Sequence, residues 1–136
     1  MSTPEKLEKT DDEWRAELTP DQYAVLRQGA TEPPWAGKYV DEKGDGVYRC
    51  AGCGNELFDA RTKFDSGSGW PSFTDPVFEG AVETKLDTSH GMVRTEAVCA
   101  RCGGHLGHVF DDGPAEAGGM RWCINGCALD LARREG

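Results

Sequence analysis

The chain has 136 residues, a formal net charge of −9 at pH 7 and 38% hydrophobic residues. This length predicts one domain with one core, and the excess of acidic residues disfavours nucleic acid and anionic membranes as partners. The N-terminus lacks the apolar region of a secretory signal, and no run of 18 apolar residues occurs. We therefore expect a cytoplasmic monomer, with a loose segment over 1–9 and a single domain over 10–136.

Two capping signals predict two short helices near the N-terminus. Thr10 precedes a run of acidic residues, and Thr19 precedes a proline at the first helical position. Both threonines are favoured N-cap residues, and acidic side chains suit the first helical turn. The predicted helices cover 12–18 and 20–27, and the second stops at Gly29.

The remainder of the chain predicts short strands separated by turns. Prolines make 31–37 an extended linker, and glycine, serine and proline make 64–73 a loop. One of the strands is expected to bend at Gly107. The composition therefore indicates a mainly β domain with an N-terminal helical cover. The predicted strands run over 46–50, 55–59, 81–87, 91–99, 104–114 and 120–131.

Four of the six cysteines form two CxxC pairs, Cys50 with Cys53 and Cys99 with Cys102. Two such pairs can present four sulfurs to one tetrahedral metal ion, so the spacing predicts one structural Zn²⁺ per chain. With four protein ligands the site is closed and the zinc is not catalytic. Redox-active dithiols and a rubredoxin-like iron site are the alternative interpretations.

A fifth cysteine, Cys123, lies in the last predicted strand. Alternation places Arg121, Cys123 and Asn125 on one face, and turns Trp122 and Ile124 toward the core. A neighbouring arginine favours the thiolate, which is the nucleophilic form of cysteine. Composition alone is equally compatible with an inert, half-buried cysteine.

Three further motifs bear on the role of Cys123. They are KFDSGSGWPSF (63–73), RTEAVCARCGGHLGHVFDDGP (94–114) and RWCIN (121–125). Together with the CxxC pairs, they resemble the methionine-R-sulfoxide reductase B family over roughly residues 10–131. The resemblance implies two antiparallel sheets in a distorted, barrel-like sandwich with short N-terminal helices and the zinc at the end away from Cys123.

The resemblance also implies an activity, the thiol-dependent reduction of methionine-R-sulfoxide, protein-bound or free, to methionine as a repair of oxidative damage. Cys123 would attack the sulfoxide sulfur and become a sulfenic acid. Trp70 would pack against the S-methyl group of the substrate. The proton donor to the sulfoxide oxygen is left open. The family's polar wall around this oxygen corresponds to His105, His108, Asn125 and Arg121.

The predicted roles of the two histidines depend on the geometry of their strand. His105 and His108 would face opposite ways on a regular strand, and they converge only if Gly107 breaks the pleat. A second metal ion bound by both histidines and Cys123 is the alternative reading of this group.

The chain departs from the family where many members carry a resolving cysteine, since Ser68 stands there. Cys127 is a possible resolving residue, but four residues along a strand span about 13 Å. A disulfide requires Cα atoms roughly 4.4–6.8 Å apart, so Cys127 fits a small buried residue better. We therefore expect an external reductant: thioredoxin, glutaredoxin or a small thiol.

Two hypotheses from other classes remain open. Small β folds with two CxxC turns also serve as zinc-stabilised binding modules without catalysis. The CxxC pairs could alternatively form a redox switch that releases zinc on oxidation.

Overall fold

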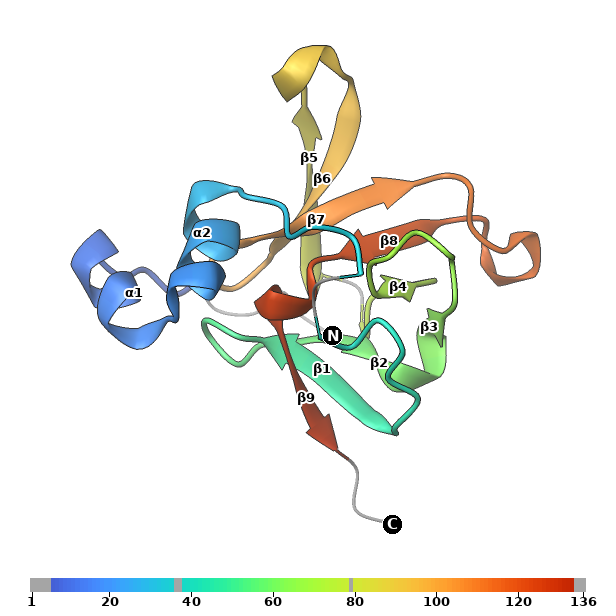
Figure 1. Ribbon diagram of the computed structural model, residues 1–136, viewed down its shortest axis with the longest axis horizontal. Coiled ribbons are helices and arrows are strands. Elements are labelled where there is room, and N and C mark those ends of the chain that lie inside the picture. The colour runs from blue at the N-terminus through green and yellow to red at the C-terminus, as the bar shows by residue number, and fades with distance from the viewer. Residues whose placement is uncertain (1–5, 36–37, 79, 134–136) are drawn as a thin grey trace.

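The computed structural model describes residues 6–35, 38–78 and 80–133 (Figure 1). Two short helices lie beside two antiparallel sheets, which confirms the mainly β prediction. Part of the expected loose segment 1–9 lies outside the described residues. In its described part, the backbone N–H of Leu7 donates to the carbonyl of Arg101 at 2.7 Å.

Helices α1 (Asp11–Glu17) and α2 (Pro20–Gln28) begin at the two predicted caps. The side chains of Thr10 and Thr19 each accept a backbone hydrogen bond from the first helical turn. Gly29 ends α2 in the left-handed conformation, with φ of 71°. Neither helix of the described chain has the length and apolar character needed to cross a bilayer.

The smaller sheet has the strand order β2-β1-β9, and both pairings are antiparallel. Its strands are β1 (Gly46–Cys50), β2 (Glu56–Asp59) and β9 (Leu129–Arg133). This sheet lies in the lower part of Figure 1, and β9 runs from it toward the C-terminus.

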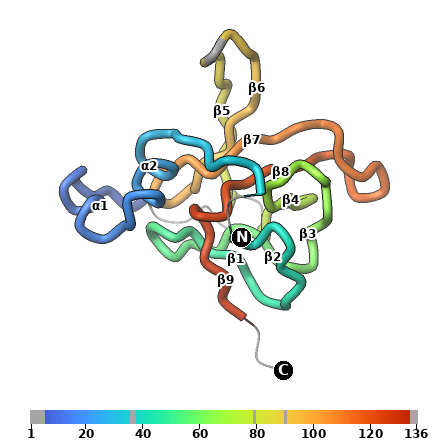
Figure 2. The backbone as a smooth tube through the Cα atoms, in the orientation of Figure 1, coloured from blue at the N-terminus to red at the C-terminus, as the bar shows by residue number. Residues whose placement is uncertain are grey.

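The larger sheet has the order β3-β4-β8-β7-β6-β5, again with antiparallel pairings throughout. The hairpin of β5 and β6 projects from the rest of the molecule, as the tube in Figure 2 shows. Both sheets are open, so the expected barrel-like form does not extend to a closed barrel. The strands are β3 (Lys63–Phe64), β4 (Ser72–Phe73), β5 (Val82–Asp87), β6 (Arg94–Cys99), β7 (His105–Phe110) and β8 (Arg121–Ile124).

The prediction of one continuous strand over 120–131 is wrong. Strand β8 ends at Ile124, a 3-10 turn covers Gly126–Ala128, and the chain continues as β9 in the other sheet. A Cβ atom at Gly126 would lie 2.1 Å from the carbonyl oxygen of Lys38, so the turn packs closely against another backbone. The predicted loop 64–73 likewise contains short strand segments that its composition concealed.

Aromatic side chains join the two sheets. Phe58 of β2 stacks on Phe73 of β4 with ring centroids 4.5 Å apart, and Tyr48 of β1 meets Phe73 edge-on at 5.2 Å. All three side chains are fully buried. Burial of such rings and their offset or edge-on contacts are stabilising, so this cluster holds the smaller sheet against the larger one.

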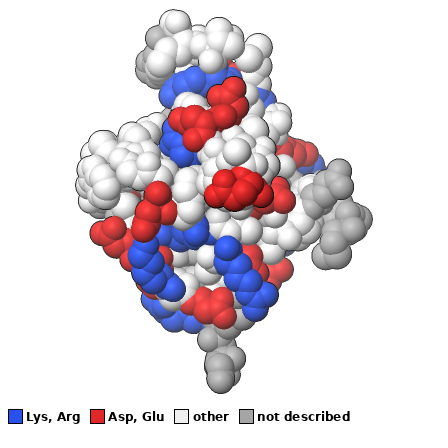
Figure 3. Space-filling view, turned by 90° about the vertical axis from the view of Figure 1, so that its right-hand side faces the viewer, with Lys and Arg blue, Asp and Glu red and all other residues white. Residues whose placement is uncertain are grey.

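Surface ion pairs contribute less to the stability of the fold than the buried aromatic cluster does. Acidic and basic side chains lie interspersed on the face drawn in Figure 3. Exposed ion pairs such as Lys43 with Asp65, at 2.6 Å, contribute little net free energy because solvent screens them. The buried core therefore contributes more to the stability of the fold than these surface ion pairs do.

Candidate active site and metal centre

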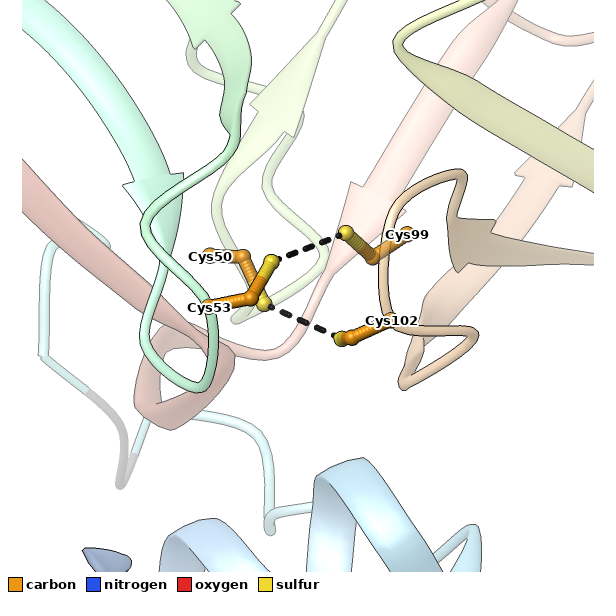
Figure 4. A group of neighbouring side chains, drawn as sticks. All are labelled: Cys50, Cys53, Cys99 and Cys102. Carbon is orange, nitrogen blue, oxygen red and sulfur yellow. Dashed lines mark hydrogen bonds between the residues drawn. The ribbon is translucent and has the colours of Figure 1, made fainter. Parts of the chain in front are cut away.

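The four CxxC cysteines converge on one point (Figure 4). Their Sγ atoms all lie within 4.8 Å of one another, with Cys50 to Cys102 at 3.7 Å and Cys53 to Cys99 at 3.5 Å. A tetrahedral zinc with Zn–S bonds of about 2.3 Å would place its sulfurs about 3.8 Å apart. The donor set and its spacing therefore fit a metal ion.

Each cysteine pair follows a strand of a different sheet. Cys50 ends β1 in the smaller sheet, and Cys99 ends β6 in the larger one. Gly54 and Gly103 close the two turns in the left-handed conformation, with φ of 79° and 74°. A bound metal would consequently tie the two sheets together.

Cys123 lies on the central strand β8, between β4 and β7. Its direct neighbours across the sheet are Ser72 on one side and His108 on the other. Cys123 is 9% exposed and lines a cavity of about 150 Å³. The opposite face of β8 turns Ile124 into the core, as alternation predicts.

The same cavity gathers most of the predicted site. Trp70, His108, Arg121 and Asn125 line it together with Cys123. Ser68 also lines it, with its Oγ 4.0 Å from the sulfur of Cys123.

His105 lines an adjoining cavity of about 310 Å³, which shares His108 with the first. The two histidine rings meet edge-on with centroids 5.4 Å apart. They converge because the pairing of β6 with β7 shifts register opposite Leu106, next to Gly107. Among the described residues, neither histidine joins Cys123 in a group that could hold a metal ion, so nothing supports a second metal there.

Two carboxylates that the sequence reasoning missed support these histidines. Asp87 Oδ2 lies 2.7 Å from His108 Nε2, and Glu96 Oε2 lies 2.6 Å from His105 Nδ1. Both acids come from the projecting hairpin of β5 and β6. Glu96 could have been suspected only from the register, which pairs it directly with His108 across the sheet.

Burial and the neighbouring Asp87 shift the pKa of His108 in opposite directions. Burial lowers the pKa of His108, and the hydrogen bond to Asp87 partly restores it. The pKa of Asp87 is held well below its ordinary value, chiefly by the hydroxyl of Ser89 and then by His108. These hydrogen bonds thus favour the charged form of the Asp87 carboxyl group beside the imidazole.

The nucleophile candidate is held mainly as a thiol. Burial raises the pKa of Cys123, and the guanidinium of Arg121 lowers it by a smaller amount. Arg121 is itself fixed by two hydrogen bonds to Asp112, at 2.8 and 3.3 Å, and lies over the ring of Phe110. Arg121 lowers the pKa of Cys123, as the sequence predicted, but burial raises this pKa by more.

Trp70 and Asn125 are both anchored by a third residue, Glu32. The indole Nε1–H of Trp70 donates to the carbonyl of Glu32 at 2.9 Å. The side-chain oxygen of Asn125 accepts the backbone N–H of Glu32 at 3.0 Å, and its amide nitrogen donates to the carbonyl of Leu106. The proline-rich segment, expected only as a linker, therefore forms one side of the site.

Cys127 lies in the 3-10 turn after β8 rather than on a strand. It is half-buried and lines a different cavity, beside Asp21 and Glu32. Burial, together with the charge of Glu32, raises the pKa of Cys127 to about 12. This thiol is consequently a poor nucleophile near neutral pH.

Comparison with known proteins gives a consistent result. The SelR domain family matches residues 18–133. The chain is 56% identical over 130 residues to the peptide methionine sulfoxide reductase MsrB of Bradyrhizobium diazoefficiens, covering 96% of this chain and 93% of that protein. It is 57% identical over 130 residues to the protein of the same name from Pseudomonas putida strain GB-1, covering 96% and 98%. The corresponding protein of Thiobacillus denitrificans is 55% identical over 131 residues, covering 96% and 97%.

Proposed function

The chain belongs to the SelR domain family of methionine-R-sulfoxide reductases B, and on that premise we propose that it reduces methionine-R-sulfoxide in oxidised proteins to methionine. The observation that carries the proposal is the pairing of Cys123 with His108 in one buried cavity that also contains Trp70. A thiol, an acid–base group and an apolar ring are the components that the reaction requires.

The reaction transfers one oxygen atom. The Cys123 sulfur attacks the sulfoxide sulfur while the sulfoxide oxygen is protonated, and the oxygen then passes to the cysteine. Methionine sulfur gains two electrons and Cys123 loses two, so the products are methionine and a sulfenic acid. The oxygen takes one proton from the acid, and the proton that the Cys123 thiol loses restores that acid. The sum is therefore one thiol and one sulfoxide giving one sulfenic acid and one thioether, with no net change in charge.

We assign proton delivery to His108. Asp87 accepts from Nε2, which favours the tautomer with the proton on that nitrogen and leaves Nδ1 to exchange a proton with bound substrate. His105, held by Glu96, would support the same polar wall with Arg121 and Asn125. Trp70 would face the S-methyl group, since an apolar ring suits an apolar substituent.

The oxidised enzyme would be recycled by an external thiol. One thiol condenses with the sulfenic acid to give a mixed disulfide and water, and a second thiol releases Cys123. Ser68 cannot form a disulfide, and the raised pKa of Cys127 argues against its acting as the resolving residue. Thioredoxin, glutaredoxin or a small thiol would supply the electrons, and the cytoplasm provides such reductants.

The four-cysteine cluster would hold Zn²⁺ in a structural role. Its four thiolates close the coordination shell, so no position remains for substrate. The metal would stabilise the junction of the two sheets, and the chain's own residues would carry out the reaction. The chain would act as a monomer, since the residues that we assign to the reaction all belong to one chain and a single copy would suffice.

A stereochemical assay tests the proposal. A blocked methionine sulfoxide, supplied as both epimers with excess dithiothreitol, would be followed by chiral chromatography. We expect loss of the R epimer only, and no loss with Cys123→Ser. Persistence of both epimers with a folded, metal-loaded wild-type protein would contradict the proposal and favour a binding module.

A further inference from the structure

The segment 30–35 connects two parts of the cavity that are distant in sequence. Glu32 is half-buried while the residues on either side of it are exposed. Its backbone contacts Trp70 and Asn125 of the site, and its carboxylate contacts the turn that follows β8, through four hydrogen bonds in all. We propose that Glu32 is a positioning residue, which sets Trp70 and the turn after Cys123 in the geometry that binds the sulfoxide.

The carboxylate holds the turn that follows the nucleophile strand. Its Oε2 accepts the backbone N–H of Gly126 at 2.7 Å, and its Oε1 accepts the N–H of Cys127 at 3.1 Å. These N–H groups open a 3-10 turn, where backbone donors lack partners within the turn itself. A charged acceptor makes such hydrogen bonds stronger than a neutral one does.

The backbone of the same residue holds the two side chains. Its carbonyl accepts the indole N–H of Trp70 at 2.9 Å, and its N–H donates to Asn125 at 3.0 Å. Pro33 and Pro34 restrict the dihedral angles of the segment that follows. The N–H of Trp35 also donates to the carbonyl of Gly69, at 2.7 Å, next to Trp70. Because one residue makes both sets of contacts, the hydrogen bonds of the Glu32 carboxylate also restrict the position of the Trp70 indole.

This arrangement matters because Trp70 and Cys123 belong to different elements. Trp70 lies on the loop before β4, and Cys123 lies on β8. The substrate must touch both at once, and a misplacement of about 1 Å can reduce the rate of a catalysed reaction by about 10²-fold. The inference rests on the proposed function, since it assigns the role of Glu32 in that reaction.

The test uses Glu32→Gln in the full-length protein, with Asp21→Asn as the matched control. The glutamine keeps the size of the side chain, but its amide nitrogen cannot accept a backbone N–H. Asp21 lines the cavity beside Cys127 and also raises the pKa of that thiol. Its backbone carbonyl accepts from the Cys127 thiol at 3.9 Å, and within the described part of the chain no hydrogen bond joins Asp21 to Trp70 or Asn125. The control thus removes a nearby charge without removing the positioning contacts.

We expect Glu32→Gln to raise KM for an R-sulfoxide peptide and to lower kcat/KM by about 10- to 100-fold. The alkylation rate of Cys123 by iodoacetamide should stay within about twofold of wild type, because the nucleophile keeps its strand neighbours. Alkylation of Cys127, followed by peptide mass, should become faster in both variants. Asp21→Asn should keep the wild-type KM.

A double-mutant cycle with Trp70→Phe tests whether Glu32 acts through Trp70. The phenylalanine keeps an aromatic ring and removes the indole N–H donor. If Glu32 acts through Trp70, the double variant should be no worse than the worse single variant. Additive losses would overturn this route, and so would a wild-type KM in Glu32→Gln. A loss accompanied by rapid alkylation of Cys123 and a non-cooperative melt would also overturn it, because Glu32 would then only maintain the fold. Wild-type protein inactive on the R epimer would instead refute the proposed function.

Discussion

The four-cysteine cluster and the cavity around Cys123 use the same side chain in opposite ways. In the cluster, sulfurs lie 3.5 to 3.7 Å apart across the two sheets, and each can serve as one ligand of a metal. In the cavity, one buried thiol faces a histidine and a serine. The difference teaches that a cysteine's role is set by the groups around its sulfur. In the cluster these are three other sulfurs presented by two CxxC turns, and in the cavity they are a histidine and a serine.

Removal of a metal ligand should have the largest effect. Cys50→Ser should lose the bound metal and with it the cooperative fold, because metal binding and folding are coupled at such a site. Metal content and thermal melting of the variant measure this outcome. A Cys50→Ser protein that is metal-free, folded and active would show that the cluster is dispensable.

The substitution Asp87→Asn changes the residue that contacts His108 and leaves Cys123 unaltered. Loss of the carboxylate should lower the pKa of His108 further, since Asp87 partly offsets the effect of burial. An acid is active only while protonated, so the decline in rate with rising pH should begin at lower pH, and kcat should fall by about tenfold. A pH profile of single-turnover rates measures both effects.

The control for that experiment is Asp130→Asn, which removes an exposed carboxylate from strand β9. Its profile should overlay the wild-type curve. An unchanged profile for Asp87→Asn would mean that His108 is not the group that delivers the proton.

Ser68→Cys should convert the cavity from a site with one reactive thiol to a site with two. The hydroxyl of Ser68 lies 4.0 Å from the Cys123 sulfur, so a thiol there can condense with the sulfenic acid. After one turnover without reductant, the variant should lose two free thiols, with a disulfide between residues 68 and 123 identified by mass spectrometry. Loss of only one free thiol, with a sulfenic acid left on Cys123, would show that the loop keeps the two sulfurs apart.

Cys127→Ser should have the smallest effect. The thiol lies in the turn beyond β8 with its pKa raised to about 12, so it contributes little nucleophile. Turnover with dithiothreitol or thioredoxin should stay within about twofold of wild type. A selective loss of the thioredoxin-supported rate would instead identify Cys127 as the resolving residue.

Local signals predicted the parts of the fold that depend on nearby residues. The two threonine caps located both helices, and the CxxC spacing located the cluster, because each signal acts within a few residues. The motifs also named the residues that line the cavity. The break after Ile124 was missed, because it depends on the close approach of Gly126 to Lys38, far away in the sequence.

The supporting residues of the cavity were harder to predict for the same reason. Asp87 and Glu96 reach the histidines only through the pairing of β5, β6 and β7. Glu32 reaches the turn after β8 across more than 90 residues of chain. No short pattern marks an acid that acts through such distant contacts, so the register of the sheet had to be known first.

The position of β8 has a consequence for synthesis on the ribosome. This strand pairs with β4 on one side and β7 on the other, although both precede it in the chain. The larger sheet therefore stays divided until residues 121–124 have emerged, and the smaller sheet must wait for β9. A nascent chain would expose β4 and β7 as open edges during this interval, so the thiol that we propose as the nucleophile arrives with the strand that completes the sheet.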